Sequence, residues 1–451
     1  MSAELTERDY RCPAPQRWAV AAAFLLLTAC ASTRYPVNPP LPPGGVAAPY
    51  DVPERVNVDA ASDLFVSVHL SGGGTRAAAL AFGVFEAMES IRLGSSGRRT
   101  LLDETDVIAA VSGGSIAAAF YGLNGKRFFE DFPERVLYRD LQALMWQEFL
   151  NPATLWRLSS PQFGRIEVVA DVYDRHVFGG ATFADFRSRG PAILIGATEL
   201  SGGHRFEFRQ STFDALCSDL NAFPVARAVA ASSAVPLIFS PMTLVSHWDQ
   251  CPEPKPDRST LPAWLRAPYI HLLDGGLSDN ISSRGPLEFV EQQGGIVSAA
   301  KAHGVERVRL MVFVVVNAET RSERSEDMSA DVPGPWRTLQ ALIDIPINRY
   351  SGETVRRLRE TAAAWQAQLR EAARVPDSGI AADVEVRVIE VNLRDAMTMA
   401  GGDELVSAPT SLALPRVLVD RIRTYGFERF LSQPDSQAAI RRMQEVLDSP
   451  R

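Results

Sequence analysis

Residues 64–91 read LFVSVHLSGGGTRAAALAFGVFEAMESI, and this stretch decides the fold. The first seven residues alternate in polarity and are rich in β-branched and aromatic side chains, which predicts a strand. Three glycines follow. Residues 75–91 then have helical spacing, with one apolar side made by Leu80, Val84, Phe85 and Met88. A strand, a glycine turn and a helix in direct succession are typical of a layered α/β fold.

The same succession recurs farther along the chain. Residues 106–111 are an apolar run, which turns through Ser112, Gly113 and Gly114 into a small-residue helix at 115–121. Further strands are predicted at 192–199 and 204–208, which form a hairpin, and at 269–273, 308–316 and 384–391. Helices are predicted at 127–149, 223–233, 354–374 and 414–447. The unbroken apolar run at 308–316 indicates a central strand of a mostly parallel sheet.

Composition narrows the function classes. The chain has 451 residues, 46% hydrophobic and 22% charged, which suits one large core with a smaller accessory region. Its formal net charge of -8 argues against a nucleic-acid partner, because such proteins carry a basic face. No Cys/His spacing suggests zinc, and no metal or cofactor is expected.

The N-terminal segment predicts export and lipidation. Arg17 precedes an apolar run at 18–29 that is too short to span a bilayer, since a spanning helix takes ~20 residues. The run suits a secretory signal peptide at 1–29, although a short buried helix is the alternative. Its end, Leu27-Thr28-Ala29-Cys30, resembles a bacterial lipobox, in which Cys30 receives acyl chains such as palmitate and becomes the first residue.

The segment after Cys30 predicts where the protein is held. Residues 31–53 contain seven prolines and indicate an extended tether, placed at 30–61, between membrane and domain. Ala31 follows the cysteine in place of Asp, which by resemblance to bacterial lipoproteins favours the outer membrane, facing the periplasm. Once Cys12 is cleaved off and Cys30 is lipidated, Cys217 and Cys251 remain. These two either form a disulfide in that oxidising compartment or stay as unpaired buried thiols.

Three segments can carry chemistry, and each begins where an apolar strand ends. The first, residues 71–76, reads SGGGTR, and its glycines leave backbone N–H groups uncovered at the start of a helix. Such a loop can bind a phosphate or stabilise an oxyanion. The spacing of Gly72, Gly74 and Ala77 also fits a loose dinucleotide fingerprint, but no acidic residue ends a second strand at the required distance.

The other two segments supply a nucleophile and an acid. Residues 110–114 read AVSGG and have the form of a nucleophile elbow, in which Ser112 projects only because its neighbours are small. The N–H of Gly113 can join an oxyanion hole. Asp274 ends a strand, and the two glycines after it allow close approach to another loop. Taken singly, Ser112 can lie in a turn without catalytic meaning, and Asp274 can simply cap a turn.

Together, SGGGTR, AVSGG and DGG resemble the motifs of the patatin-like phospholipases and their cytosolic phospholipase relatives. The resemblance covers about residues 63–320, and residues 231–239, ASSAVPLIF, are similar to a helix-end block of that family. It implies a three-layer α/β/α fold and a Ser-Asp dyad without a catalytic histidine. We therefore expect a catalytic domain at 62–320 and a mainly helical C-terminal extension at 321–451, packed on the core.

The resemblance also implies roles for single residues. Ser112 matches the nucleophile and Asp274 the base, while the oxyanion and phosphate-binding loop is matched by Gly72, Gly73, Gly74 and Arg76. This sequence departs from the commonest family pattern at Ser71, Ala77 and Ala110, all of which are small residues that preserve the geometry.

The implied activity is that of a lipid acyl hydrolase of the phospholipase A or lysophospholipase type, acting on membrane lipids at the cell envelope. An acyltransferase on the same dyad and a non-catalytic lipid-binding lipoprotein are the alternatives. The mechanistic alternative is a Ser-His-Asp triad, for which the chain offers His69, His176, His204, His247, His271 and His303, the last being closest in order. Residues 249–268 predict either a lid that meets lipid or a plain surface insertion.

Overall fold

The structure is a computed structural model that describes residues 33–46, 49–50, 63–95, 97–253, 255, 257–302, 304, 307–321 and 326–449. The predicted signal peptide, the predicted lipidation site Cys30 and His303 lie outside these ranges. Within them, no helix is both long enough and apolar enough to cross a bilayer.

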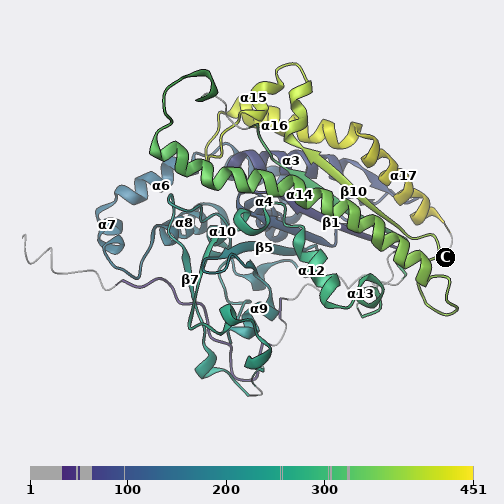
Figure 1. Cartoon of the computed structure of the whole chain (residues 1–451), viewed down its shortest axis with the longest axis horizontal. Coiled ribbons are helices and arrows are strands. Elements are labelled where there is room, and N and C mark those ends of the chain that lie inside the picture. Colours follow the sequence, from purple (N-terminus) through teal and green to yellow (C-terminus); the bar gives the residue numbers. More distant parts are fainter. Residues whose placement is uncertain are drawn as a thin grey trace, which may run out of the picture.

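An eight-stranded sheet forms the centre of the molecule (Figure 1). Its order is β10-β9-β1-β4-β5-β8-β7, with β6 paired to β5. The strands from β10 to β5 are parallel, whereas β8 runs antiparallel to both β5 and β7. The strand bounds are β1 Leu64–Leu70, β4 Val107–Val111, β5 Ala192–Glu199, β6 Arg205–Glu207, β7 Met242–Val245, β8 Tyr269–Asp274, β9 Leu310–Asn317 and β10 Glu385–Asn392. A separate small hairpin pairs β2 Arg92–Leu93 with β3 Arg99–Thr100.

Helices cover both faces of this sheet, so the predicted three-layer α/β/α fold is confirmed. One face packs against α3 Gly74–Ser90, α4 Ser112–Asn124, α8 Arg165–Tyr173, α10 Val225–Ser232, α16 Arg416–Ser432 and α17 Pro434–Asp448. The other packs against α12 Arg284–Gln292, α13 Ile296–Ala302 and α14 Pro335–Ala372. The remaining helices are α5 Phe128–Phe132, α6 Leu141–Leu150, α7 Pro152–Leu158, α9 Gln210–Ala215, α11 Gly276–Asp279 and α15 Gly402–Val406.

Strand β9 shows why the sheet must be covered on both sides. All eight of its residues are buried. Val312, Val314 and Val316 belong to one hydrophobic core, whereas Met311, Phe313 and Val315 belong to the other. Because side chains alternate along a strand, only a two-faced burial accommodates this apolar run.

The C-terminal third contributes a strand to the central sheet and is not a separate helical extension. The strand predicted at 384–391 is β10, and it pairs along its full length with β9. Helix α16 packs closely on α3, where a Cβ on Gly83 would lie 2.0 Å from the carbonyl oxygen of Arg423. The boundary predicted at residue 320 therefore falls inside one folded core. Helix α14 also begins at Pro335, well before the predicted residue 354, and it continues through Pro346.

Part of the predicted tether is docked on the domain. The side chain of Asn38 is fully buried and donates to the Ser218 hydroxyl and to the carbonyl oxygen of Val245, both at 2.9 Å. The N–H of Leu41 donates to the carbonyl oxygen of Cys217. Cys217 forms a disulfide with Cys251, as one of the two interpretations of the sequence holds. We call residues 33–46 the strap.

Candidate active site

The turn between β4 and α4 places Ser112 at the carboxyl end of a central strand. Ser112 has a φ of +50°, a left-handed conformation that is strained for a residue with a side chain. A Cβ on Gly113 would lie 2.1 Å from the carbonyl oxygen of Gly74, and one on Gly114 would lie 2.6 Å from that of Ser71. The two glycines after the serine are therefore needed because the glycine loop 71–74 packs directly on the turn.

A second serine holds this turn in place. The backbone N–H of Ser112 donates to the Ser232 hydroxyl at 2.8 Å, and that hydroxyl donates to the carbonyl oxygen of Gly196 at 2.6 Å. Ser232 is completely buried at the end of α10. It ties the middle of β5 to the elbow and so fixes the backbone from which the Ser112 side chain projects. Ser232 lies in the block 231–239 noted above, but its support of the elbow was not predicted from the sequence.

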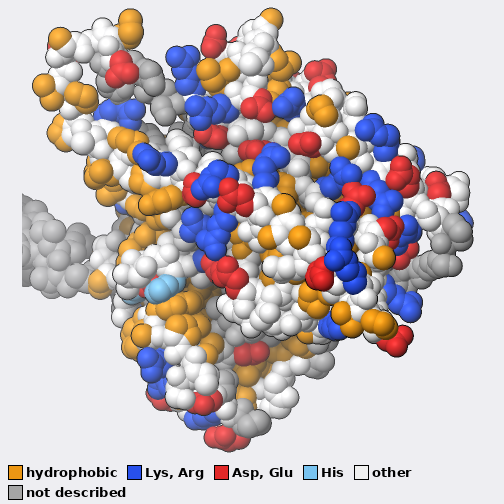
Figure 2. All heavy atoms as spheres, turned by 45° about the vertical axis from the view of Figure 1, so that its right-hand side comes forward, with side chains coloured by type: hydrophobic (Ala, Val, Ile, Leu, Met, Phe, Trp, Pro, Cys, Tyr) orange, Lys and Arg blue, Asp and Glu red, His pale blue; other side chains and the backbone are white. Residues whose placement is uncertain are grey.

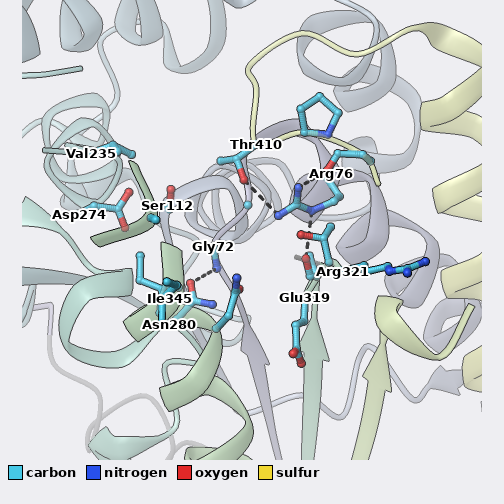
Figure 3. A pocket seen from close by; sticks show the side chains of 18 of the residues that line it. Gly72, Arg76, Ser112, Val235, Asp274, Asn280, Glu319, Arg321, Ile345 and Thr410 are labelled. Atoms are coloured by element: carbon cyan, nitrogen blue, oxygen red, sulfur yellow. Dashed lines mark hydrogen bonds between the residues drawn. The ribbon is translucent and has the colours of Figure 1, made fainter. Parts of the chain in front are cut away.

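Asp274 reaches Ser112 because of the register of β8, which runs antiparallel to β5. The last residue of β8 pairs with Ala197, one residue beyond the Gly196 that pairs with Val111. A Cβ on Gly275 would lie 2.5 Å from the carbonyl oxygen of Gly196. The glycine after Asp274 thus permits the close approach that the DGG motif predicts. In Figure 3 the Asp274 carboxylate and the Ser112 side chain lie side by side.

The Asp274 carboxyl group is buried, and burial makes its carboxylate a stronger base. Burial raises its pKa from 3.8 to about 6, against the opposing effects of the Gly276 N–H and the Ser112 hydroxyl, which hydrogen-bond to it. The Gly276 N–H donates to Oδ1 at 2.8 Å. A carboxylate is a better proton acceptor when its pKa lies nearer to neutral pH.

The glycine loop 71–74 leads into α3, which begins beside Ser112. A Cβ on Gly72 would lie 3.2 Å from Cβ of Ser112, and Gly73, with a φ of +135°, precedes the first residue of α3. The N–H of Gly72 already donates to the backbone oxygen and to Oδ1 of Asn280, at 3.3 and 3.2 Å (Figure 3). Gly74 and Gly113 contact each other. Of the four predicted glycines, Gly72 and Gly73 line the cavity, and Arg76 lines it as well.

Ser112 and Asp274 open into a cavity of about 450 Å³. Its walls include Val235 and Pro236 on one side and, on the other, Arg337, Ala341 and Ile345 from the first half of α14. The segment 406–410 closes a third side. The cavity residues from α14 and from the segment 406–410 were not predicted from the sequence. They come to the site only through the packing of the C-terminal third.

Comparison with known proteins assigns the fold a family. Residues 68–283 match the family model described as Patatin-like phospholipase. The chain carries a patatin-like phospholipase domain. The matched segment contains the glycine loop, Ser112 and Asp274, and it ends before β9 and β10, which complete the sheet.

Two solved structures are similar to this chain at low sequence identity. Human GIVD cytosolic phospholipase A2 is 12% identical with a TM-score of 0.46, over 88% of this chain and 63% of that one. VipD from Legionella pneumophila is 10% identical with a TM-score of 0.32, over 94% of this chain and 73% of that one. The chain thus spans less than two thirds of the human structure. No curated protein sequence matches it.

Arg76 of the patatin-like domain is committed to holding loops together. Its side chain is buried and donates to the carbonyl oxygens of Ala318 and Ala408, at 3.0 and 2.5 Å, and to the Thr410 hydroxyl at 3.2 Å. It ties the start of α3 to the end of β9 and to the segment 406–410. Of its two predicted roles, these contacts favour steadying the loop over binding a phosphate.

No histidine among the described residues lines the cavity of the patatin-like domain. His69 is buried within β1, hydrogen-bonded to the Ser282 carbonyl oxygen at 2.8 Å, and burial lowers its pKa to about 4.

The segment 249–268, predicted as a lid or a surface insertion, is likewise absent from the described cavity walls. It joins β7 to the start of β8, at the opposite end of β8 from Asp274, and its Trp264 stacks on His204. These positions favour the surface insertion over the lid.

Proposed function

We propose that the patatin-like domain hydrolyses carboxylic ester bonds of membrane lipids, with Ser112 as nucleophile and Asp274 as base. The observation that carries this proposal is the pairing of a serine in a strained elbow with a buried carboxyl group whose pKa is raised to about 6. A weak base needs such a shift if it is to accept the proton of an alcohol without a histidine.

The proposed reaction has two steps. Asp274 accepts the Ser112 proton as Oγ attacks the ester carbonyl carbon, and the collapse of the tetrahedral intermediate releases the lipid alcohol, which takes that proton. Water then attacks the acyl-enzyme and gives one proton to Asp274, and the fatty acid leaves as the Ser112 hydroxyl is restored. In both steps the oxyanion lies near the starts of α3 and α4. The N–H of Gly73 is the first candidate donor, and one such donor is worth ~3–4 kcal/mol.

The test is fatty-acid release from a phospholipid and from a soluble p-nitrophenyl ester. We expect Ser112→Ala and Asp274→Asn to lose activity on both substrates, and each of the six histidine variants to keep it. Labelling with a fluorophosphonate separates the mechanisms further. If Asp274→Ala is labelled at the normal rate while one histidine variant is not, the dyad is wrong and a triad operates. If Ser112→Ala matches the wild-type rates, the domain binds lipid without catalysis.

We also propose that the protein is anchored to the bacterial outer membrane through lipid on Cys30, facing the periplasm. The support is the lipobox-like sequence at 27–30 and the residue Ala31 after it. Metabolic labelling with an alkyne palmitate analogue tests it directly. Label should enter the wild-type protein and be absent from Cys30→Ala, and the labelled protein should fractionate with outer membranes.

A further inference from the structure

Exposed apolar side chains occur on α6, on α7 and in the loop after α10, which contributes Val235 and Pro236 to the wall of the active-site cavity. Six of them form what we call the apolar rim: Trp146, Leu150, Leu155, Trp156, Leu237 and Ile238. Each is between 45% and 72% exposed. Trp146 and Leu150 lie on α6, Leu155 and Trp156 on α7, and the last two in the loop after α10. Large exposed apolar groups gathered in one place mark a binding surface.

The rim is continuous with the cavity. Leu237 follows Val235 and Pro236, which line the cavity that contains Ser112. The carbonyl oxygen of Leu237 accepts a hydrogen bond from Arg165 at 2.9 Å, which fixes this loop to the start of α8, just after α7. Across the mouth, Leu342 and Ile345 of α14 are also exposed, at 67% and 62%. In Figure 2 hydrophobic side chains gather along the left of the molecule, the side on which Figure 1 places α6 and α7.

The strap brings the N-terminal end of the described chain to the same place. The carbonyl oxygen of Thr33 accepts from the Ser160 hydroxyl at 2.5 Å, and the N–H of Tyr35 donates to the carbonyl oxygen of Gln162 at 2.8 Å. Both partners lie in the connection between α7 and α8. Two residues, Ala31 and Ser32, lie between Cys30 and Thr33, so these three residue steps span at most roughly 11 Å in a fully extended chain. An acyl chain on Cys30 would therefore enter a bilayer next to α7.

We propose that the apolar rim docks on the surface of the lipid bilayer, so that the cavity of Ser112 opens directly onto the membrane. The inference rests on the proposed lipid hydrolase and its anchor at Cys30. Tryptophan side chains favour the polar–apolar boundary of a bilayer, and the aliphatic residues gain free energy on leaving water. A short strap fixed to the domain then holds the catalytic face against the membrane, whereas a long free tether would leave it to rotate.

Tryptophan quenching by brominated lipid tests the docking without any assay of activity. The purified mature protein, which starts at lipidated Cys30 and has lost Trp18 with the predicted signal peptide, is incorporated into phosphatidylcholine vesicles whose acyl chains carry bromine. We expect quenching in the wild-type protein and its loss in the double variant Trp146→Phe/Trp156→Phe. The matched control is Trp264→Phe, because Trp264 stacks on His204 in the β7–β8 connection, away from the rim, and this variant should be quenched like the wild type.

Activity gives a second, independent reading. Leu150→Glu places a charge on the rim, and we expect fatty-acid release from vesicles to fall by roughly tenfold or more while hydrolysis of a soluble ester is unchanged. The matched control is Val375→Glu, which is 60% exposed just beyond the end of α14 and should change neither rate.

The outcomes separate the two proposals. If the wild-type protein hydrolyses neither substrate, the proposed function fails while the quenching result still decides the docking. If quenching is equal in the wild type and the double tryptophan variant, the rim does not meet lipid. A dimer in solution whose formation Leu150→Glu prevents would show that a second copy of the chain covers the rim, and it would overturn the docking as well.

Discussion

Replacing Asp274 with asparagine should remove activity and make the protein more stable at alkaline pH. Burial raises the pKa of this carboxyl group from 3.8 to about 6, so the folded state resists its ionisation. The protonated, buried Asp274 contributes favourably to the free energy of unfolding. This contribution is fully present below about pH 3.8 and is lost as the pH rises through 6. The difference of about two pKa units, at ~1.36 kcal/mol each, amounts to about 3 kcal/mol at pH 8.

Asparagine avoids this cost and keeps the local contacts. Its side-chain oxygen can still accept the Gly276 N–H, which donates to Oδ1 of Asp274 at 2.8 Å. Thermal unfolding followed by circular dichroism measures the result. With ~2.1 cal/mol/K per residue, a gain of about 3 kcal/mol raises Tm by roughly 3 °C at pH 8 in a chain of 451 residues. At pH 4, where both side chains are largely neutral, the two Tm values should nearly coincide.

Two results would refute this reasoning. One is a Tm difference of the same size at pH 4 and pH 8, which would mean that shape and not charge decides it. The other is a destabilised Asp274→Asn at pH 8. Ser112→Ala is the control, because it removes activity and keeps the buried carboxyl group, so its Tm should fall with rising pH as the wild-type Tm does.

Three further predictions test the site and its frame. The kcat/KM for a soluble ester should fall about tenfold for each pH unit below about 6, because Asp274 must be ionised to act as base; a rate independent of pH between 4 and 7 would contradict this role. Gly113→Ala should lower stability by roughly 3 kcal/mol or more and abolish activity, since its Cβ would meet the Gly74 carbonyl oxygen at 2.1 Å; Gly352→Ala in α14, with open space around it, should instead stabilise by about 0.5–1 kcal/mol in urea unfolding. Cys251→Ser should cost about 3–4 kcal/mol, as expected for opening a loop of 34 residues, and reduction of the wild-type protein should lower its Tm to match.

Local sequence patterns were enough to predict several elements of the fold. Strand β1, helix α3, the elbow at Ser112 and the strand that ends at Asp274 were all predicted within one or two residues. Each leaves a mark that is visible within a dozen residues, such as apolar alternation, helical spacing or glycines at a sharp turn. The three motifs were predicted to form one site because together they resemble the patatin-like phospholipases. The ends of the strands alone do not place Asp274 beside Ser112, since β8 runs antiparallel to β5.

Contacts between distant segments decided the rest. Ser232 supports the elbow from 120 residues away, and Asn280 joins the glycine loop to Ser351 of α14. The segment 406–410 reaches the cavity only because β10 joins the sheet and Arg76 bonds to the carbonyl oxygen of Ala408. A hydrogen bond across such a separation leaves no periodicity in either partner's sequence.

The strap shows the same division between sequence and tertiary structure. Its prolines correctly indicate extended chain, because proline restricts the backbone and forms no helix interior. Whether an extended chain is free or docked depends on the surface that it meets, here the pocket for Asn38 beside Ser218. The sequence by itself predicted a nucleophile at Ser112 and a base at Asp274. Only the tertiary structure decided which walls enclose that chemistry and which face of the domain the chain leaves from, since both depend on packing between residues far apart in sequence.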